Sequence, residues 1–281
     1  MTSAMPAVPA ATAAPRVNRV ASFGYLLLSE WTKIRTVRST VWTLIVFVVV
    51  SVGLTAVFAL VIVTSWTGKG SASRDATVIS DPVSSLLGTG VSLGQLAVCV
   101  LGVLVMTTEY STGVIRASLL AVPKRLPMLA AKATVFAALI LVVGEVVTFG
   151  SFFVGAAILH SHVTVTLGDP GVARAVIGTG MVLAVLGVFA LAIGTLVRHT
   201  AGAIATVIGV VLVLPILSGL LPGNWGAHVN AYLPEQAGGL IVQAHRHQGD
   251  LLSAWQGFGV FCLWTAILLA LAAYLLRRRD A

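Results

Sequence analysis

The stretch VWTLIVFVVVSVGLTAVFALVIV, residues 41–63, decides the fold. Its 23 residues include no Asp, Glu, Lys or Arg. About 20 residues, rising ~1.5 Å each in a helix, are enough to cross the hydrocarbon core of a bilayer. Further apolar runs follow at 86–106, 133–159, 176–197, 202–221 and 254–276. We therefore predict an all-α polytopic membrane protein with six transmembrane helices, of which the third is long enough to tilt, break or project beyond the bilayer.

The overall composition excludes a soluble domain. Hydrophobic residues make up 58% of the chain and charged residues 9%, whereas a soluble domain carries roughly 25% charged residues. The net charge of +8 does not indicate nucleic acid, because the Lys and Arg residues fall in blocks between the apolar runs and form no single basic face. Both cysteines, Cys99 and Cys262, lie inside apolar runs and indicate no redox compartment. Membrane lipids are the expected surroundings, and we expect no nucleic-acid partner.

The distribution of positive charge predicts the orientation in the membrane. With six spans, both termini lie on the same side. The segments on that side carry 13 Lys and Arg residues, against 4 on the other. Since positive residues accumulate on the cytoplasmic side, we expect cytoplasmic termini and a cytoplasmic location for segment 107–132.

The residues before the first span divide into two parts. Residues 1–17 are rich in Ala, Pro, Thr and Ser, so we expect a disordered tail. Segment 18–40 places Trp31 and Ile34 in an apolar stripe, and it also carries Lys33, Arg35 and Arg38. This pattern favours an amphipathic helix in the membrane interface, and a plain cytoplasmic helix is the alternative. Glu30 and Lys33 are spaced to form an ion pair.

Two prolines predict local structure near the fifth span. Pro215 removes a backbone donor and should bend that helix. The segment after the span, 222–253, is the longest on its side of the membrane, and Pro234 followed by Glu235 suits the first turn of a helix. We expect one or two short extracellular helices here, lying on the outer leaflet or dipping into it.

A few residues stand out inside or beside the spans. Glu145 lies about 12 residues, or ~18 Å, into the third span, near the middle of the membrane. A carboxylate there is a functional candidate, and the alternative is a protonated Glu bonded to a neighbouring helix, with Thr148 on the same face. Gly90 and Gly94 allow a close approach of helices, which we assign to packing within the bundle. His245 and His247 form only a weak metal pattern, so we predict no metal site.

No catalytic motif emerges, so we do not expect an enzyme. There is no His-Glu-x-x-His, no Gly-x-Ser-x-Gly and no pair of intramembrane carboxylates. The sequence GKGS, residues 68–71, lacks the features of a Walker A motif. We therefore expect no cofactor on this chain, and any ATP must be bound by another protein.

The order of the segments and their local sequence motifs resemble the permease subunit of a type-2 ATP-binding cassette (ABC) transporter. SEWTKIRTVRST, residues 29–40, looks like the first segment of actinobacterial members. MTTEYSTGVIR, residues 106–116, with PKR at 123–125, looks like their Glu-Tyr-x-x-Gly-x-Ile-Arg loop. Tyr232-Leu-Pro234 with Ala237-Gly238 is similar to their outer segment. The resemblance covers about 17–279, and the Glu-Tyr-x-x-Gly element is its most specific part.

This resemblance implies partners and a role for the loop. The partners would be two copies of a separate ATPase subunit, which hold ATP and Mg²⁺, and a second permease chain in a bacterial plasma membrane. The loop residues would dock on the ATPase and couple hydrolysis to export of a drug, peptide or lipid: Glu109, Tyr110, Gly113, Arg116, Lys124 and Arg125. The alternative is that these residues only cap the second span and fix topology.

Two other classes of function fit the sequence less well. A non-transporting sensor or assembly factor would have the same topology and no ATPase partner. An intramembrane enzyme would need paired polar residues at matching depth, which the sequence lacks.

Overall fold

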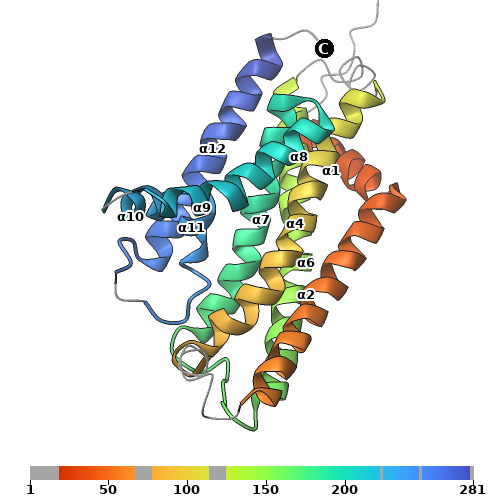
Figure 1. Cartoon of the computed structure of the whole chain (residues 1–281). Coiled ribbons are helices and arrows are strands. Elements are labelled where there is room, and N and C mark those ends of the chain that lie inside the picture. The colour runs from red at the N-terminus through yellow and green to blue at the C-terminus, as the bar shows by residue number, and fades with distance from the viewer. Residues whose placement is uncertain (1–18, 67–77, 114–124, 222–223, 247–248, 279–281) are drawn as a thin grey trace, which may run out of the picture.

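Our computed structural model describes residues 19–66, 78–113, 125–221, 224–246 and 249–278, and all regular secondary structure within these residues is helical (Figure 1). The helices are α1 Arg19–Thr36, α2 Arg38–Thr64, α4 Pro82–Ser111, α6 Arg125–Leu159, α7 Val172–Val197, α8 Thr200–Ile208, the π-helical segment η1 Gly209–Val213, α9 Leu214–Gly219, α10 Asn224–Ala231, α11 Pro234–Gly239 and α12 Ala254–Arg278.

Six helices in the described residues are long and apolar enough to cross a membrane, which confirms the predicted number. The bounds of these helices differ most from the predicted spans on either side of the polar loop 107–132. There α4 continues to Ser111 and α6 already begins at Arg125. Helix α6 has 35 residues, more than the predicted span, because its first turns precede the apolar run 133–159. The connection between the two helices is therefore much shorter than the predicted loop 107–132.

Helix α7 forms the centre of the bundle. In its most apolar window 78% of the residues are buried, against 28% for α2 and 22% for α12.

Glycines allow the helices to approach closely. A Cβ atom on Gly102 of α4 would lie 2.6 Å from the carbonyl oxygen of Gly187 in α7. On α4, Gly90 and Gly94 lie against Thr55 and Ser51 of α2, so this glycine pair packs within the bundle, as expected.

The fifth span is interrupted. Its helical pattern changes to π-helix at Gly209–Val213, and Pro215 then lies in the first turn of α9. Proline cannot donate a backbone hydrogen bond, so it is tolerated at this position. The side-chain amide of Asn230 in α10 donates to the Pro215 carbonyl oxygen over 3.2 Å. A change of helix type thus occurs close to Pro215, where a bend was predicted, and the chain then returns along the bundle.

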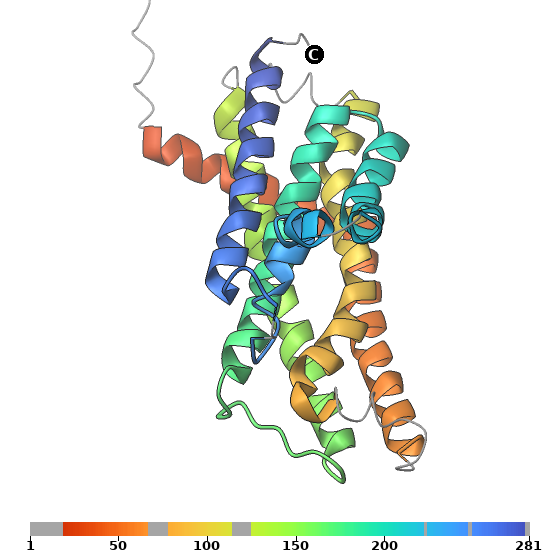
Figure 2. The same cartoon turned by 60° about the vertical axis from the view of Figure 1, so that its left-hand side comes forward.

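Short helices α10 and α11 lie beside the middle of the bundle (Figures 1 and 2). The indole nitrogen of Trp264, near the middle of α12, donates to the Tyr232 carbonyl oxygen at 3.0 Å. Pro234 begins α11, as its sequence context predicts. The segment between α9 and α12 thus returns deep along the bundle.

Helix α1 runs across the bundle (Figure 2) and is separated from α2 at Val37. The sequence pattern placed Trp31 and Ile34 in one apolar stripe of an interfacial helix. In the structure Glu30 is 2% exposed and Ile34 7%, whereas Trp31 is 43% exposed. The side of α1 that packs on the bundle therefore includes Glu30, because this carboxylate has a partner inside the bundle.

Candidate functional site

A buried ion-pair network joins α1, α4 and α6 at one end of the bundle. Lys132 of α6 lies 2.6 Å from Glu30 Oε2 of α1 and 2.7 Å from Glu109 Oε1 of α4. Lys33 of α1 lies 2.6 Å from Glu30 Oε1 and 3.4 Å from Glu109 Oε1. The network therefore consists of two carboxylates and two ammonium groups. It lies at the end where α4 and α12 finish and α6 begins, which we call the loop end.

Burial makes the network energetically important. Lys132 and Glu30 are each 2% exposed, and Glu109 is 8% exposed. Burial alone would raise the pKa of Glu30, but Lys132 and Lys33 hold it below its ordinary value. Burial alone would lower the pKa of Lys33, and Glu30 and Glu109 raise it above its ordinary value. Both groups are thus charged at neutral pH, and removing one member would leave another charge buried without compensation.

The position of Glu109 changes its expected role. The resemblance assigns it to a surface that docks on a soluble ATPase, yet its side chain is 10% exposed and Oε1 accepts hydrogen bonds from both lysines. Its Oε2 atom is buried and has no hydrogen-bond partner among the described residues. Glu109 therefore helps to hold α1, α4 and α6 together. Any role in coupling to an ATPase would be indirect.

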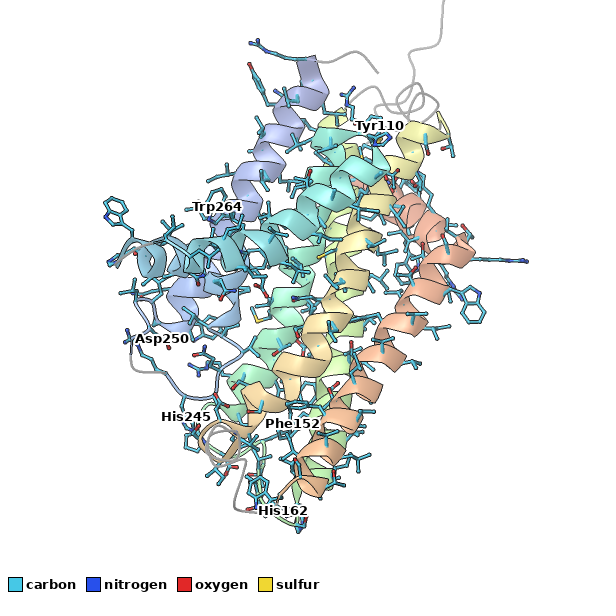
Figure 3. The ribbon with its side chains drawn as sticks, in the orientation of Figure 1. Tyr110, Phe152, His162, His245, Asp250 and Trp264 are labelled. Carbon is cyan, nitrogen blue, oxygen red and sulfur yellow. The ribbon has the colours of Figure 1, made fainter. Side chains whose placement is uncertain are left out.

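The neighbouring Tyr110 connects the same end of α4 to α7. Figure 3 shows Tyr110 at the loop end. The guanidinium carbon of Arg198 lies 5.0 Å from the centre of its ring, within the range of a cation–π contact. Arg198 ends α7 with φ +60°, a left-handed conformation that is unusual for a residue other than glycine. The strained backbone directs the chain into α8 after one further residue, His199, whose ring accepts from the Gly202 amide.

The other loop residues are only partly described. Gly113 follows α4 with φ +70°, consistent with the predicted change in chain direction. Arg116 and Lys124 lie outside the described residues. Arg125 begins α6, and its side chain also lies outside the described part of the structure. On the other side of the network, Arg35 and Arg38 are exposed.

Sequence reasoning found one contact of the network and missed the rest. The Glu30–Lys33 pair follows from their spacing on one helix and is present. The pairing of Glu30 with Lys132, 102 residues apart, has no local signal. One clue was available, because Lys132 lies directly before a long apolar run, where an unpaired ammonium would be costly. The Tyr110–Arg198 contact was likewise unforeseen.

Glu145 lies apart from this network. Its carboxylate packs against Gly180 of α7, where an added Cβ would collide with it. Thr148, expected on the same face of the helix, donates to the Glu145 backbone carbonyl over 3.2 Å. The Oε2 atom is buried and has no hydrogen-bond partner among the described residues. The structure thus explains how Glu145 fits between the helices and assigns its carboxyl group no polar partner.

A second polar region is a cavity of about 800 Å³. The first half of α4, the middle of α7 and the returning segment with α10 and α11 form its walls. Glu235 of α11 lies in this wall and accepts a hydrogen bond from Gln95 of α4 at 3.3 Å. His245 is not among the residues that line this cavity, and His247 lies outside the described residues. Among the residues that the structure describes, no three His, Cys, Asp or Glu side chains are grouped to bind a metal.

No family model, curated protein or solved structure matches this chain. The assignment of a function therefore depends on the residues of the chain and on their geometry.

Proposed function

We propose that this chain is the permease subunit of an ABC transporter and exports a hydrophobic or amphipathic substrate. The observation that carries the proposal is the buried network at the base of the polar loop. Glu109 ends the second span, Lys132 lies near the start of the third, and both contact α1. These three helices flank the Glu-Tyr-x-x-Gly-x-Ile-Arg segment that resembles a coupling loop.

The network gives a physical route from the loop to the membrane helices. Lys132 contacts carboxylates on two other helices at 2.6 and 2.7 Å. A force on the loop would act on the ends of α4 and α6, and the buried charges would make α1 move with them. Separating these charges is costly in a site with little water. The three helices would therefore move as one body, as alternating access requires.

The remaining parts fit this function as follows. Helix α1 lies in the cytoplasmic membrane interface, where its exposed Trp31 and Arg35 contact lipid, as does Arg38 at the start of α2. Both termini are cytoplasmic, and α10 and α11 return into the outer half of a bacterial plasma membrane. Two copies of a separate ATPase subunit hold ATP and Mg²⁺, and a second permease chain completes the pathway.

The decisive experiment uses the ATPase encoded next to this chain. If a neighbouring reading frame encodes an ATPase with Walker A and signature motifs, we expect the two proteins to co-purify and candidate substrates to stimulate hydrolysis. Reversing the loop charge by Arg116→Glu should preserve assembly and abolish this stimulation, because a docking contact would become repulsive. Arg277→Glu, at the exposed end of α12, is the matched charge reversal and should remain coupled.

Two results would contradict the proposal. The first is a folded permease that does not associate with the neighbouring ATPase. The second is an Arg116→Glu complex that assembles and keeps full stimulation by substrate.

A further inference from the structure

The cavity beside α10 and α11 has the size of a small-molecule site. Its volume of about 800 Å³ lies within the range of pockets that hold drug-sized ligands. It is partly open and is lined by residues of five helices, α4, α7, α9, α10 and α11, and of the segment between α11 and α12. It is separate from the ion-pair network, because none of the four network residues lines it.

Part of the cavity wall is apolar. Leu87 and Val91 of α4, Val182 and Leu183 of α7, and Leu240 and Val242 of the returning segment line it. Within the described lining there is no Phe, Tyr or Trp, so an aromatic cage does not account for recognition. Such a wall suits the apolar body of a ligand.

The cavity lining also contains the carboxyl group of Glu235, whose hydrogen-bond partners among the described residues carry no positive charge. Glu235 Oε1 accepts from the side-chain amide of Gln95 at 3.3 Å, and Oε2 accepts from that of Gln236 at 3.2 Å. Both donors are neutral, and a carboxylate has about four acceptor positions. Burial raises the pKa of Glu235, and the hydrogen bond from Gln95 opposes this effect only in part.

The described lining contains no residue that would attract an anion by its fixed charge. It includes Glu235 and Asp250, together with His228, and neither Lys nor Arg. A cation brought to Glu235 would gain the attraction of a carboxylate in a site with restricted water. An anion of the same size would meet repulsion there.

We propose that this cavity binds an amphipathic organic cation, with its apolar body against α4 and α7 and its positive group at Glu235. The inference rests on the proposed export function, since it names the class of substrate. The binding site itself is tested on the permease alone, so that the two proposals fail separately.

The test compares two ions of nearly equal size and opposite charge. The purified full-length chain in neutral detergent is titrated with tetraphenylphosphonium and with tetraphenylborate, and binding is measured by equilibrium dialysis. We expect the protein to bind the cation and to discriminate against the anion. Glu235→Gln should weaken cation binding about tenfold or more, whereas Glu235→Asp should preserve part of it.

A second variant blocks the cavity and leaves the carboxylate in place. Gly88 lines the cavity and has open space where a Cβ would lie, so Gly88→Phe should project a ring into it and abolish binding. Gly259→Phe is the matched control on the exposed side of α12, also in open space. Asp169→Asn removes one negative charge from an exposed loop and controls for net charge. Both controls should bind as the wild type does.

Equal affinity for the two ions, or unchanged cation binding in folded Glu235→Gln and Gly88→Phe proteins, would overturn the proposal. Binding that follows the expected pattern in a chain that recruits no ATPase would support the site and contradict the export function. If the transporter is coupled but its purified permease binds both ions and all variants equally, the export function would be supported and the cation site contradicted.

Discussion

Lys132 is the residue on which the loop-end network depends. Its ammonium group is 2% exposed and is the only buried cation that contacts both carboxylates among the described ion pairs. Lys33 contacts the same carboxylates, but its side chain is 38% exposed and is partly solvated. The two lysines therefore make similar contacts in different surroundings.

We predict that Lys132→Met destabilises the protein far more than Lys33→Met does. Breaking a buried ion pair by removing one partner costs roughly 3–5 kcal/mol, because the remaining charge is left uncompensated. Removing a partly exposed partner costs about 0–1 kcal/mol. Reversible unfolding in detergent micelles would measure both values. Equal stability losses in the two variants would contradict the buried network.

The pH dependence of the same difference is a further check. The pKa of Glu30 in the folded protein lies below its ordinary value, so its contribution to stability is complete above that ordinary value. It is lost as the pH falls through the lowered, folded-state pKa. The stability gap between wild type and Lys132→Met should therefore be constant near neutrality and narrow in acid. A gap that persists after Glu30 is protonated would indicate that packing, and not charge, holds Lys132 in place.

At the scale of helices, close approach depends on a few glycines. A Cβ on Gly90 of α4 would lie 2.7 Å from the carbonyl oxygen of Ser51 and 2.9 Å from the amide nitrogen of Thr55, both in α2. These are backbone atoms, which cannot rotate away. Gly53 of α2 faces open space instead. Both positions are glycine, but only Gly90 lacks the space for a Cβ atom.

We predict opposite effects for alanine at these two positions. Gly90→Ala should force α2 and α4 apart and cost about 1–3 kcal/mol. Gly53→Ala should be neutral or stabilise the helix by up to ~1 kcal/mol, because alanine is the better helix former. Thermal unfolding of the two variants in one detergent provides the comparison. A Gly90→Ala protein as stable as the wild type would show that the two helices are less closely packed.

The same scale shows what sequence alone can predict. Apolar runs and turn residues predicted the six long helices and the start of α11 at Pro234. These features depend on local chemistry. The contact of Glu30 with Lys132 and the cavity wall made by Gln95 and Glu235 depend on the tertiary arrangement, across 102 and 140 residues. No periodicity in one segment specifies such pairs.

At the scale of the molecule, the two ends of the bundle are held by different interactions. The loop end has charged side chains paired with each other. At the opposite end, polar side chains hold the backbone of the returning segment. Arg174 donates to the carbonyl oxygens of Gln243 and Ala244 at 2.8 and 2.9 Å, and Asp81 accepts from the Ala244 amide at 3.1 Å. A movement that begins at the loop would thus meet a second fixed point near the cavity.

The placement of these ends across a membrane gives the last prediction. Ser111 lies at the loop end, where 13 of the Lys and Arg residues gather in sequence, and Ser161 follows α6 at the opposite end. Because positive residues are retained in the cytoplasm, a cysteine at 111 should react with a membrane-impermeant maleimide only in permeabilised cells. A cysteine at 161 should react in intact cells.

Both variants are made in a Cys99→Ala, Cys262→Ala background, which removes the two natural thiols. Arg277→Cys, at the exposed end of α12, is an independent marker for the loop end and should behave as position 111 does. The physical cause is the charge asymmetry, so adding lysines beside Ser161 should weaken the preference for this orientation. Labelling at 111 and 277 in intact cells, with protection at 161, would show that the topology is the inverse of the predicted one. It would also place the Glu-Tyr-x-x-Gly loop beyond the reach of any cytoplasmic ATPase.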